Sequence, residues 1–266
     1  MNKPKKRYGQ NFLKSDAIID KIINSIDFKN KIVIEIGPGR GALTKRLIKH
    51  AKHVYAFEID ESLKGCLNTL ENSGNLIVIY KDILSINLDE FLKENNIDEA
   101  LLIANIPYYI TGPILFLIND SVLVKESVIM IQKEVGDRLL SEPGNKTYGS
   151  LTVLLGVKND IHRVTNVKNT AFYPVPKVDS VVVKLVKTNR YLDLIQSESQ
   201  FTEFVKAAFM QKRKTMLNNI TNYYQIDKQI AEDKLSRIDK EFNSLERAEN
   251  LSIERFIRYS NGWYND

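Results

Sequence analysis

The segment Glu35–Gly41, with the sequence EIGPGRG, decides the fold prediction. It follows the apolar run Lys31–Ile36 and opens a stretch with helical spacing, so it predicts a strand, a tight turn and a helix. Glycines at such a turn let the backbone approach a ligand, and a helix N-terminus adds a favourable field. The G-x-G-x-G spacing differs from the dinucleotide fingerprint and favours a nucleoside without a pyrophosphate. The alternative is a tight turn without a ligand.

Further apolar runs follow at intervals that leave room for crossover helices. They are His53–Phe57, Leu76–Tyr80, Leu101–Ala104 and Ser127–Ile131. Runs that are apolar nearly throughout are typical of parallel strands covered on both faces. Isoleucines repeat at helical spacing from Ile18 to Ile26, after the N-cap candidates Ser15 and Asp16, and predict a helix in front of the first strand. The predicted fold class is therefore α/β with a mostly parallel sheet.

The pattern changes near residue 190. Before it, the β-rich runs Ile161–Val167 and Val181–Val186 flank a proline-containing connection and predict an antiparallel hairpin at the sheet edge. After it, only helical patterns occur, at Phe201–Phe209, Gln229–Ile238 and Ile253–Tyr259. We therefore predict an α/β domain over residues 1–189 and a small helical domain over residues 190–266.

Composition allows a polyanionic partner without requiring one. The 266 residues include 38 Lys and Arg against 33 Asp and Glu, for a net charge of +5. The single Cys66 excludes an intramolecular disulfide and argues against redox chemistry and a zinc site, so we expect no metal. No apolar run reaches the ~18 residues of a membrane span, so we expect a cytoplasmic protein. The basic N-terminus could instead belong to a transit peptide, but it is neither Ser-rich nor amphipathic.

Carboxylates follow the second and third predicted strands, at Glu58 and Asp82. The carboxyl ends of parallel strands meet at the ligand-binding edge of an open α/β sheet. Glu58 is suited to accept the ribose hydroxyls of a nucleoside, and Asp82 can accept a hydrogen bond from an adenine amino group. Each acid alone would more often cap a helix or face solvent. Together they favour a nucleoside pocket.

The fourth predicted strand ends in Asn105-Ile106-Pro107-Tyr108. The proline fixes the turn, so that the Asn105 side-chain oxygen and the Ile106 carbonyl can accept both hydrogens of an exocyclic amine. Held in a pyramidal arrangement, such an amine has its lone pair free for attack. The alternative is an ordinary Asx-Pro turn. The three histidines lie away from these motifs, so catalysis by a serine or cysteine nucleophile lacks a base.

These motifs resemble the ribosomal RNA adenine dimethyltransferase family, and in particular its small-subunit branch. The likeness extends through Arg7–Leu13, Phe172–Ser180 and Phe209–Met216 to Arg247–Ser252. It implies a Rossmann-like class I methyltransferase sheet. It also implies N6,N6-dimethylation of two adjacent adenosines near the 3′ end of small-subunit rRNA, with S-adenosylmethionine as methyl donor and S-adenosylhomocysteine as product. A role in small-subunit biogenesis, a small ribosomal subunit as partner and a monomeric state follow from the same resemblance.

The resemblance assigns cofactor roles to the motif residues of this sequence. Asn11 and Leu13 would close over the methionine side of the cofactor, with Gly37 beneath it. Glu58 would hold the ribose and Asp82 the adenine. These assignments agree with the positions that the two acids take at predicted strand ends.

The resemblance also assigns three catalytic residues. Asn105 would lie between the cofactor and the target amine, while Tyr108 and Phe172 would sandwich the flipped adenine. A base extruded from RNA needs aromatic faces to replace its lost stacking. The alternative for Phe172 is a core aromatic. Tyr109 departs from the asparagine usual in relatives, and we expect altered packing there without loss of chemistry.

Basic residues provide candidate RNA contacts at two places in the chain: Lys5, Lys6, Arg7, Lys212, Arg213 and Lys214. On the face of the cleft they would form a track for RNA phosphates, although charged runs are more often solvated surface. Lys212 stands where arginine is common in the family and lacks its bidentate fork, which puts a specific phosphate or guanine contact there in doubt.

Three alternatives differ from this interpretation. A large-subunit rRNA methyltransferase of the antibiotic-resistance type shares two motifs, but the Gly-Pro-Gly turn and Gln211–Thr215 point away from it. A non-catalytic RNA-binding assembly factor would be expected to carry degraded motifs, and these are intact. A nicotinamide dehydrogenase is disfavoured by the glycine spacing.

Overall fold

The predicted apolar runs form one seven-stranded sheet with the order β4-β3-β2-β5-β6-β9-β7. The computed structural model describes residues 4–265, with the side chain of Lys6 excepted. The strands are β2 (Ile32–Ile36), β3 (His53–Phe57), β4 (Leu76–Ile79), β5 (Ala100–Asn105), β6 (Val124–Gln132), β7 (Asn159–Val167) and β9 (Ser180–Lys187). Pairing is parallel from β4 through β6, and β9 runs antiparallel to β6. The α/β prediction with a mostly parallel sheet is confirmed.

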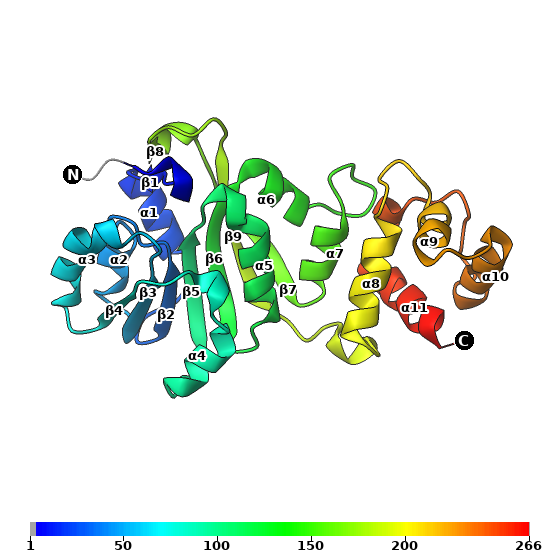
Figure 1. The fold of residues 1–266 in the computed structure, drawn as a ribbon, viewed down its shortest axis with the longest axis horizontal. Helices are drawn as coiled ribbons and strands as arrows, with labels where there is room; N and C mark the ends of the chain where they lie inside the picture. Colours follow the sequence, from blue (N-terminus) through cyan, green and yellow to red (C-terminus); the bar gives the residue numbers. More distant parts are fainter. Residues whose placement is uncertain (1–3, 266) are drawn as a thin grey trace. The chain divides into compact units, whose positions relative to one another are not determined.

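Helices cover both faces of this sheet (Figure 1). They are α1 (Asp16–Ile23), α2 (Thr44–Leu47), α3 (Lys64–Glu71), α4 (Leu88–Glu94), α5 (Thr111–Asp120) and α6 (Lys133–Leu139). On one face, Ile22 of α1 and Leu47 of α2 join a core with Val33 and Val54. On the other, the Phe91 ring of α4 lies 5.2 Å from that of Phe57. Alternate strand residues thus face different helices, which explains why the runs are apolar throughout.

The N-terminal helix is present, with one difference from its prediction. Ser15 occupies the N-cap position of α1, but its side chain makes no capping hydrogen bond. The helix ends at Ile23, before the last isoleucine of the pattern, Ile26. Burial of Ile19 and Ile22 is therefore the main support for α1.

A second, two-stranded sheet was not predicted from the sequence. Its strands β1 (Phe12–Leu13) and β8 (Phe172–Tyr173) are antiparallel, with Leu13 opposite Phe172. Each strand has only two residues, which is too short for the alternation by which strands are predicted. The pairing matters for function because it brings the N-terminal motif beside the motif around Phe172.

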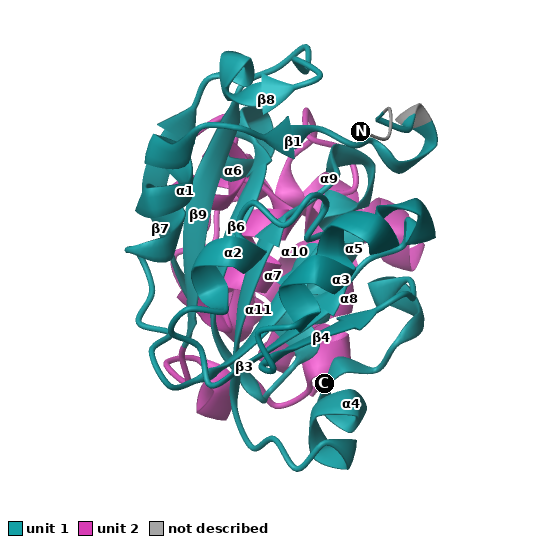
Figure 2. Cartoon of the chain, turned by 90° about the vertical axis from the view of Figure 1, so that its left-hand side faces the viewer, with its two compact units in different colours: residues 1–136, 160–187 teal, residues 137–159, 188–266 magenta. Residues whose placement is uncertain are grey.

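The remaining helices build the second compact unit (Figure 2). They are α7 (Ser150–Gly156), α8 (Glu198–Ala208), α9 (Met216–Tyr224), α10 (Lys228–Ile238) and α11 (Ile253–Tyr264). Short 3₁₀ turns complete the chain at Lys6–Tyr8, Glu61–Leu63, Ile83–Ser85, Tyr108–Ile110, Asn169–Ala171, Leu192–Leu194 and Ala248–Asn250. Aromatic rings fill the core of the second unit. The centre of the Phe204 ring lies 6.3 Å from that of Tyr259 and 6.0 Å from that of Trp263.

The two units divide the chain differently from the predicted boundary at residues 189 and 190. The first comprises residues 1–136 and 160–187, and the second comprises residues 137–159 and 188–266. The second unit takes in residues 137–159 because α7 contacts α8. This grouping is set by tertiary contacts between segments far apart in sequence. No helix within residues 4–265 is both long and apolar enough to cross a membrane.

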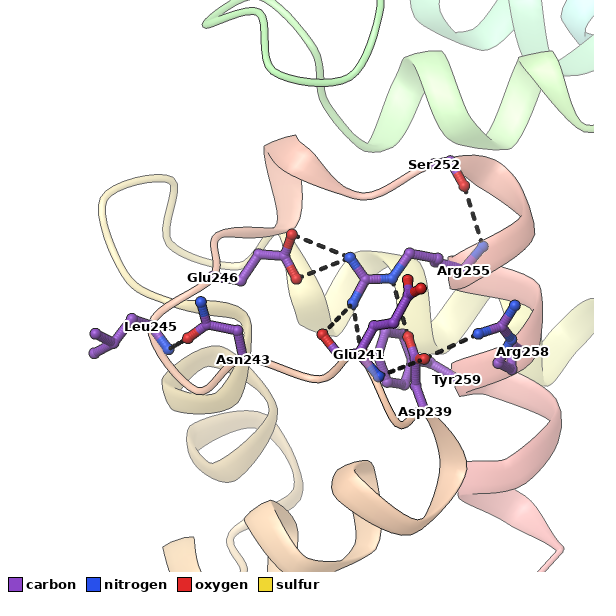
Figure 3. A network of polar contacts seen from close by, with 9 residues as sticks. All are labelled: Asp239, Glu241, Asn243, Leu245, Glu246, Ser252, Arg255, Arg258 and Tyr259. Atoms are coloured by element: carbon purple, nitrogen blue, oxygen red, sulfur yellow. Dashed lines mark hydrogen bonds and ion pairs between the residues drawn. The ribbon is translucent and has the colours of Figure 1, made fainter.

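A network of charged side chains joins α10, α11 and the loop between them (Figure 3). The Arg255 guanidinium donates to Asp239 through Nε at 3.0 Å and to Glu246 through Nη1 at 2.9 Å. Arg258 donates to the other oxygen of Asp239 at 2.9 Å. Asp239 is 1% exposed, and burial alone would raise the pKa of its carboxyl. Hydrogen bonds from the Glu241 amide and from Arg255 hold this pKa below the usual range.

Candidate active site

The glycine turn after β2 approaches the site with its backbone. Gly37 and Gly39 have φ angles of 69° and 57°, in the region that favours glycine. A Cβ on Gly39 would lie 3.1 Å from the ring of Phe12, so the turn and the N-terminal segment are in close contact. The helix that follows, α2, has only four residues, so the expected contribution of a helix N-terminus is small.

A cavity of about 340 Å³ lies at the carboxyl ends of β2, β3, β4 and β5. Its lining includes all of the predicted cofactor and catalytic residues: Asn11, Leu13, Gly37, Glu58, Asp82, Asn105, Tyr108 and Phe172. The structure thus brings together residues from six separate parts of the sequence. The volume lies within the range of about 300–1,000 Å³ that is typical of small-molecule sites.

Glu58 is oriented by backbone hydrogen bonds. Its Oε2 accepts from the amide of Gly39 at 3.1 Å, and its Oε1 accepts from the amide of Asp60 at 2.9 Å. The side chain is 6% exposed, and burial raises the pKa of its carboxyl. Each oxygen accepts one of these bonds and keeps capacity for another. Glu58 is therefore a fixed acceptor at the cavity wall.

Glu35 is a buried acid that the sequence placed in the turn motif without a role. It lines the cavity and is 1% exposed. Burial raises the pKa of its carboxyl to about 8, hydrogen bonding to Thr44 offsets part of the rise, and the Glu58 carboxylate adds to it. Its Oε2 has no hydrogen-bond partner among the described residues. At neutral pH this carboxyl is mainly protonated.

Asp82 lines the same cavity from the end of β4, but it also caps a turn. Its Oδ1 accepts from the amide of Leu84 at 3.0 Å, at the start of the 3₁₀ turn Ile83–Ser85. The side chain is exposed. Asp82 therefore both caps this turn and lines the cavity.

Asn105 and Tyr108 are tied to neighbouring segments. The Asn105 amide nitrogen donates to the Asn11 carbonyl at 3.3 Å, which links the end of β5 to the N-terminal motif. This bond turns Nδ2 toward Asn11 and leaves Oδ1 as the acceptor. The Tyr108 hydroxyl lies 2.8 Å from the Ser180 hydroxyl at the start of β9. Both side chains line the cavity.

Phe172 is the least accessible of the predicted catalytic residues. It is 1% exposed and belongs to the main apolar core, as well as to the cavity lining. Phe172 is therefore a core aromatic, as the alternative interpretation expects, and it also lines the cavity. A stacking role requires that only the face toward the cavity meets the base.

Comparison with known proteins identifies the family. The family model described as "Ribosomal RNA adenine dimethylase" matches residues 1–262. The chain belongs to this family. It is 43% identical over 265 residues to a protein of Onion yellows phytoplasma (strain OY-M) named "Ribosomal RNA small subunit methyltransferase A", covering 98% of this chain and 96% of that one.

Solved structures agree with this membership. The fold resembles that of a dimethyladenosine transferase from Plasmodium falciparum, with a TM-score of 0.77, 29% identity, and 93% and 95% of the two chains covered. It also resembles the 23S rRNA methyltransferase ErmE, with a TM-score of 0.71 and 22% identity over 95% and 99% of the chains. The second likeness concerns the fold alone. The Plasmodium falciparum structure thus agrees with the family that the sequence comparison identifies.

Tyr109, where this chain departs from the expected family residue, packs against the N-terminal segment. A Cβ on Gly9 would lie 3.2 Å from the Tyr109 ring, and Gly9 has a φ of 57°. The Tyr109 side chain is 59% exposed and borders the cavity. It therefore forms part of the cavity rim.

The predicted RNA-binding residues differ in their surroundings. Lys5 donates from Nζ to Asp60 at 2.7 Å, and Arg7 is exposed with its guanidinium 4.6 Å from the Tyr8 ring centre. The side chain of Lys6 lies outside the described part. In the second unit Lys212, Arg213 and Lys214 are exposed, and the Lys212 ammonium donates to the Lys146 carbonyl. Their contact with RNA stays a prediction.

Asp60 is the residue near the site that sequence reasoning missed. It lies two positions after Glu58 and is 2% exposed, with Lys5 and Gln10 among its partners. Its closeness to Glu58 in the sequence was a signal that Asp60 lies near the site. Its partners Lys5 and Gln10 cannot be recognised from the sequence. Within residues 4–265, no three His, Cys, Asp or Glu side chains are grouped as a metal ion would need.

Proposed function

We propose that this protein transfers methyl groups from S-adenosylmethionine to the N6 amines of two adjacent adenosines near the 3′ end of small-subunit rRNA, two to each. The observation that carries the proposal is one cavity lined by the glycine turn, Glu58, Asp82 and Asn105–Tyr108. It occurs in a chain that is 43% identical to a protein named for methylation of the small-subunit rRNA.

The residues of the cavity fit a sulfonium nucleoside. Gly37 and Gly39 leave backbone without side chains beneath the ligand, in conformations that other residues rarely adopt. Glu58 presents fixed acceptors to the ribose hydroxyls, and Asp82 presents an acceptor to the adenine amine. Asn11 and Leu13 cover the methionine side. When bound, S-adenosylmethionine supplies an electrophilic methyl group and leaves as S-adenosylhomocysteine.

The end of β5 is suited to hold the target amine. Asn105 Oδ1 accepts one amine hydrogen and the Ile106 carbonyl the other, so the nitrogen lone pair points along the line of transfer. The same acceptors stabilise the positive charge that develops on the amine. A strong general base is unnecessary, since the methylated amine can release its proton to water.

Aromatic side chains replace the stacking that the adenine loses when it leaves the RNA. Tyr108 is held by its hydroxyl contact with Ser180, and Phe172 is fixed by the core. Rigid rings at this place bind a flat base with little loss of side-chain entropy.

The substrate is a small ribosomal subunit, and each unit carries exposed basic residues suited to RNA. Arg7, Lys212, Arg213 and Lys214 are exposed cations that can neutralise RNA phosphates. We place the protein in the cytoplasm as a monomer with a role in small-subunit biogenesis. A large-subunit substrate is the second candidate, but the likeness to ErmE is one of fold, at 22% identity.

The variant Asn105→Ala tests the proposed chemistry. The wild type is expected to transfer labelled methyl groups to unmethylated small subunits. The variant is expected to do so more than about 100-fold more slowly. Calorimetry is expected to find cofactor binding largely intact. Wild-type turnover by Asn105→Ala would show that the amine is held elsewhere.

A further inference from the structure

One carboxylate beside the cavity carries an unusual number of hydrogen bonds. Asp60 accepts from Lys5 Nζ at 2.7 Å and from Gln10 Nε2 at 2.7 Å. It also accepts from the Ser62 amide at 3.1 Å and the Ser62 hydroxyl at 2.7 Å. The side chain is 3% exposed, and its hydrogen bonds hold the pKa of the carboxyl at about 2 although burial alone would raise it. It is therefore a fixed negative charge at neutral pH.

The partners of Asp60 belong to two different parts of the site. Its backbone amide donates to Glu58, the predicted ribose acceptor, at 2.9 Å. Its carboxylate binds Lys5 and Gln10, which lie at least 50 positions earlier in the chain. Asp60 does not itself belong to the cavity lining. It connects the wall that carries Glu58 to the N-terminal segment.

The N-terminal segment continues from these contacts directly into the cavity. Lys5 and Gln10 also bond to each other, from the Lys5 amide to Gln10 Oε1 at 2.8 Å. The next residues, Asn11 and Leu13, line the cavity, and Asn11 accepts from Asn105. The 3₁₀ turn Lys6–Tyr8 and the two-residue strand β1 offer few bonds of their own. The placement of this segment thus depends on its attachments, one of which is the ion pair with Asp60.

We propose that Asp60 is a positioning residue that holds the segment Lys5–Leu13 over the cofactor cavity, through Lys5 and Gln10. The proposal rests on the cofactor site of the proposed function. It assigns part of the cofactor affinity to a residue that does not touch the cofactor. An asparagine keeps one oxygen that can accept from Ser62 and Lys5, but it loses the charge that pairs with the Lys5 ammonium. Its amide nitrogen also replaces the oxygen that accepts from Gln10.

The alternative is that Asp60 only caps the turn Glu61–Leu63, which its bonds to Ser62 also achieve. A cap alone would affect local stability without changing the order of residues 5–13. Lys5→Met separates the two, because it removes the ion pair and leaves the cap in place. The Lys5 side chain is 34% exposed, so its replacement is not expected to prevent folding.

The test compares Asp60→Asn, Lys5→Met and the double variant with the wild type. Asp16→Asn is the matched control, since Asp16 forms an ion pair with Arg46 at 3.1 Å in the same unit but does not line the cavity. We expect Asp60→Asn and Lys5→Met each to weaken cofactor binding about tenfold by calorimetry without RNA. The double variant should bind the cofactor no more weakly than Asp60→Asn alone, because both substitutions remove the ion pair between Lys5 and Asp60. The control should bind as the wild type does.

Two further measurements distinguish positioning from other roles. In Asp60→Asn, the KM for the cofactor should rise while kcat at saturation changes less than about twofold, because the reacting groups stay in place. Hydrogen exchange at residues 5–13 should be faster in Asp60→Asn and Lys5→Met without cofactor, and unchanged in Asp16→Asn. Unchanged exchange and unchanged affinity in folded Lys5→Met would overturn the proposal. Failure of the wild type to bind S-adenosylmethionine would instead refute the proposed function, and the exchange experiment would still decide the role of Asp60.

Discussion

The two units each contain an aspartate with almost no solvent exposure, and the two differ in where their partners lie. Asp60 is 2% exposed and Asp239 is 1% exposed. Asp239 binds Arg255 and Arg258, which both belong to helix α11 of its own unit (Figure 3). Asp60 binds Lys5 and Gln10, which belong to a segment at the rim of the cavity.

This difference determines what each charge cluster stabilises. The Asp239 cluster joins the end of α10 to α11, which packs on α8, so its loss should affect the whole helical unit. The Asp60 cluster holds a short segment, whose release exposes little apolar surface. Equivalent chemistry thus supports global stability in one place and local order in the other.

The largest effect is expected for Arg255→Met. Among the residues that the structure describes, removing the guanidinium leaves the buried Asp239 paired with Arg258 and takes away the ion pair of Glu246. We expect a loss of about 3 kcal/mol in the free energy of unfolding of the helical unit. Urea unfolding followed by fluorescence of Trp263, the single tryptophan, reports on this unit. A loss below about 1 kcal/mol would show that the Asp239 cluster contributes no more to stability than a solvent-exposed salt bridge.

A smaller loss is expected for Gly41→Ala, in the turn of the first unit. Gly41 has a φ of 78°, and a Cβ there would lie 2.5 Å from Leu70 Cδ1. We expect a loss of about 2 kcal/mol in the stability of the first unit, measured by urea unfolding with circular dichroism. Gly74→Ala is the control, since Gly74 has a φ of 80° with nothing within 4 Å of its Cβ position. Equal losses for both would assign the effect to backbone strain alone.

Glu35→Gln should remove a pH dependence from the stability of the first unit. The folded-state pKa of about 8 lies above the ordinary value of 4.5, so the native carboxyl keeps a proton that the unfolded chain releases. Wild-type stability should therefore fall by about 1.4 kcal/mol per pH unit as the pH rises from about 5 to about 8. Urea unfolding at several pH values should find a flatter profile for the variant. Parallel profiles would mean that Glu35 is ionised in the folded protein.

The smallest change in stability is expected for Lys5→Met. Its ion pair with Asp60 is partly exposed and holds a short segment, so the global free energy of unfolding should change by less than about 1 kcal/mol. This contrasts with the larger loss expected for Arg255→Met and with the expected loss of cofactor affinity. A loss as large as that of Arg255→Met, measured by the same unfolding method, would remove the distinction between the two clusters.

The sequence predicted the parallel strands because the pattern itself carries the information. The runs from His53–Phe57 to Ser127–Ile131 are apolar nearly throughout, as is typical of parallel strands covered on both faces. The positions of Glu58 and Asn105 at strand ends then follow from the topology of such sheets. Their presence in one cavity was therefore predictable.

Other features depend on contacts between distant residues, which no local sequence pattern predicts. The pairing of Leu13 with Phe172 joins residues far apart in sequence. Helix α9 was not predicted because its asparagines at positions 218, 219 and 222 have low helix propensity. Burial of Met216 and Ile220 outweighs that preference in the folded protein. The attachment of Lys5 to Asp60 was likewise unpredictable, because a basic N-terminus indicates nucleic acid as readily as an internal ion pair.

One measurement tests the central claim most directly. Unmethylated small and large ribosomal subunits are mixed in equal amounts with the protein and S-adenosylmethionine carrying a labelled methyl group, and the modified nucleosides are mapped by mass spectrometry. We predict N6,N6-dimethyladenosine at two adjacent positions near the 3′ end of the small-subunit rRNA. Label on large-subunit rRNA, or on a base other than adenine, would contradict the account.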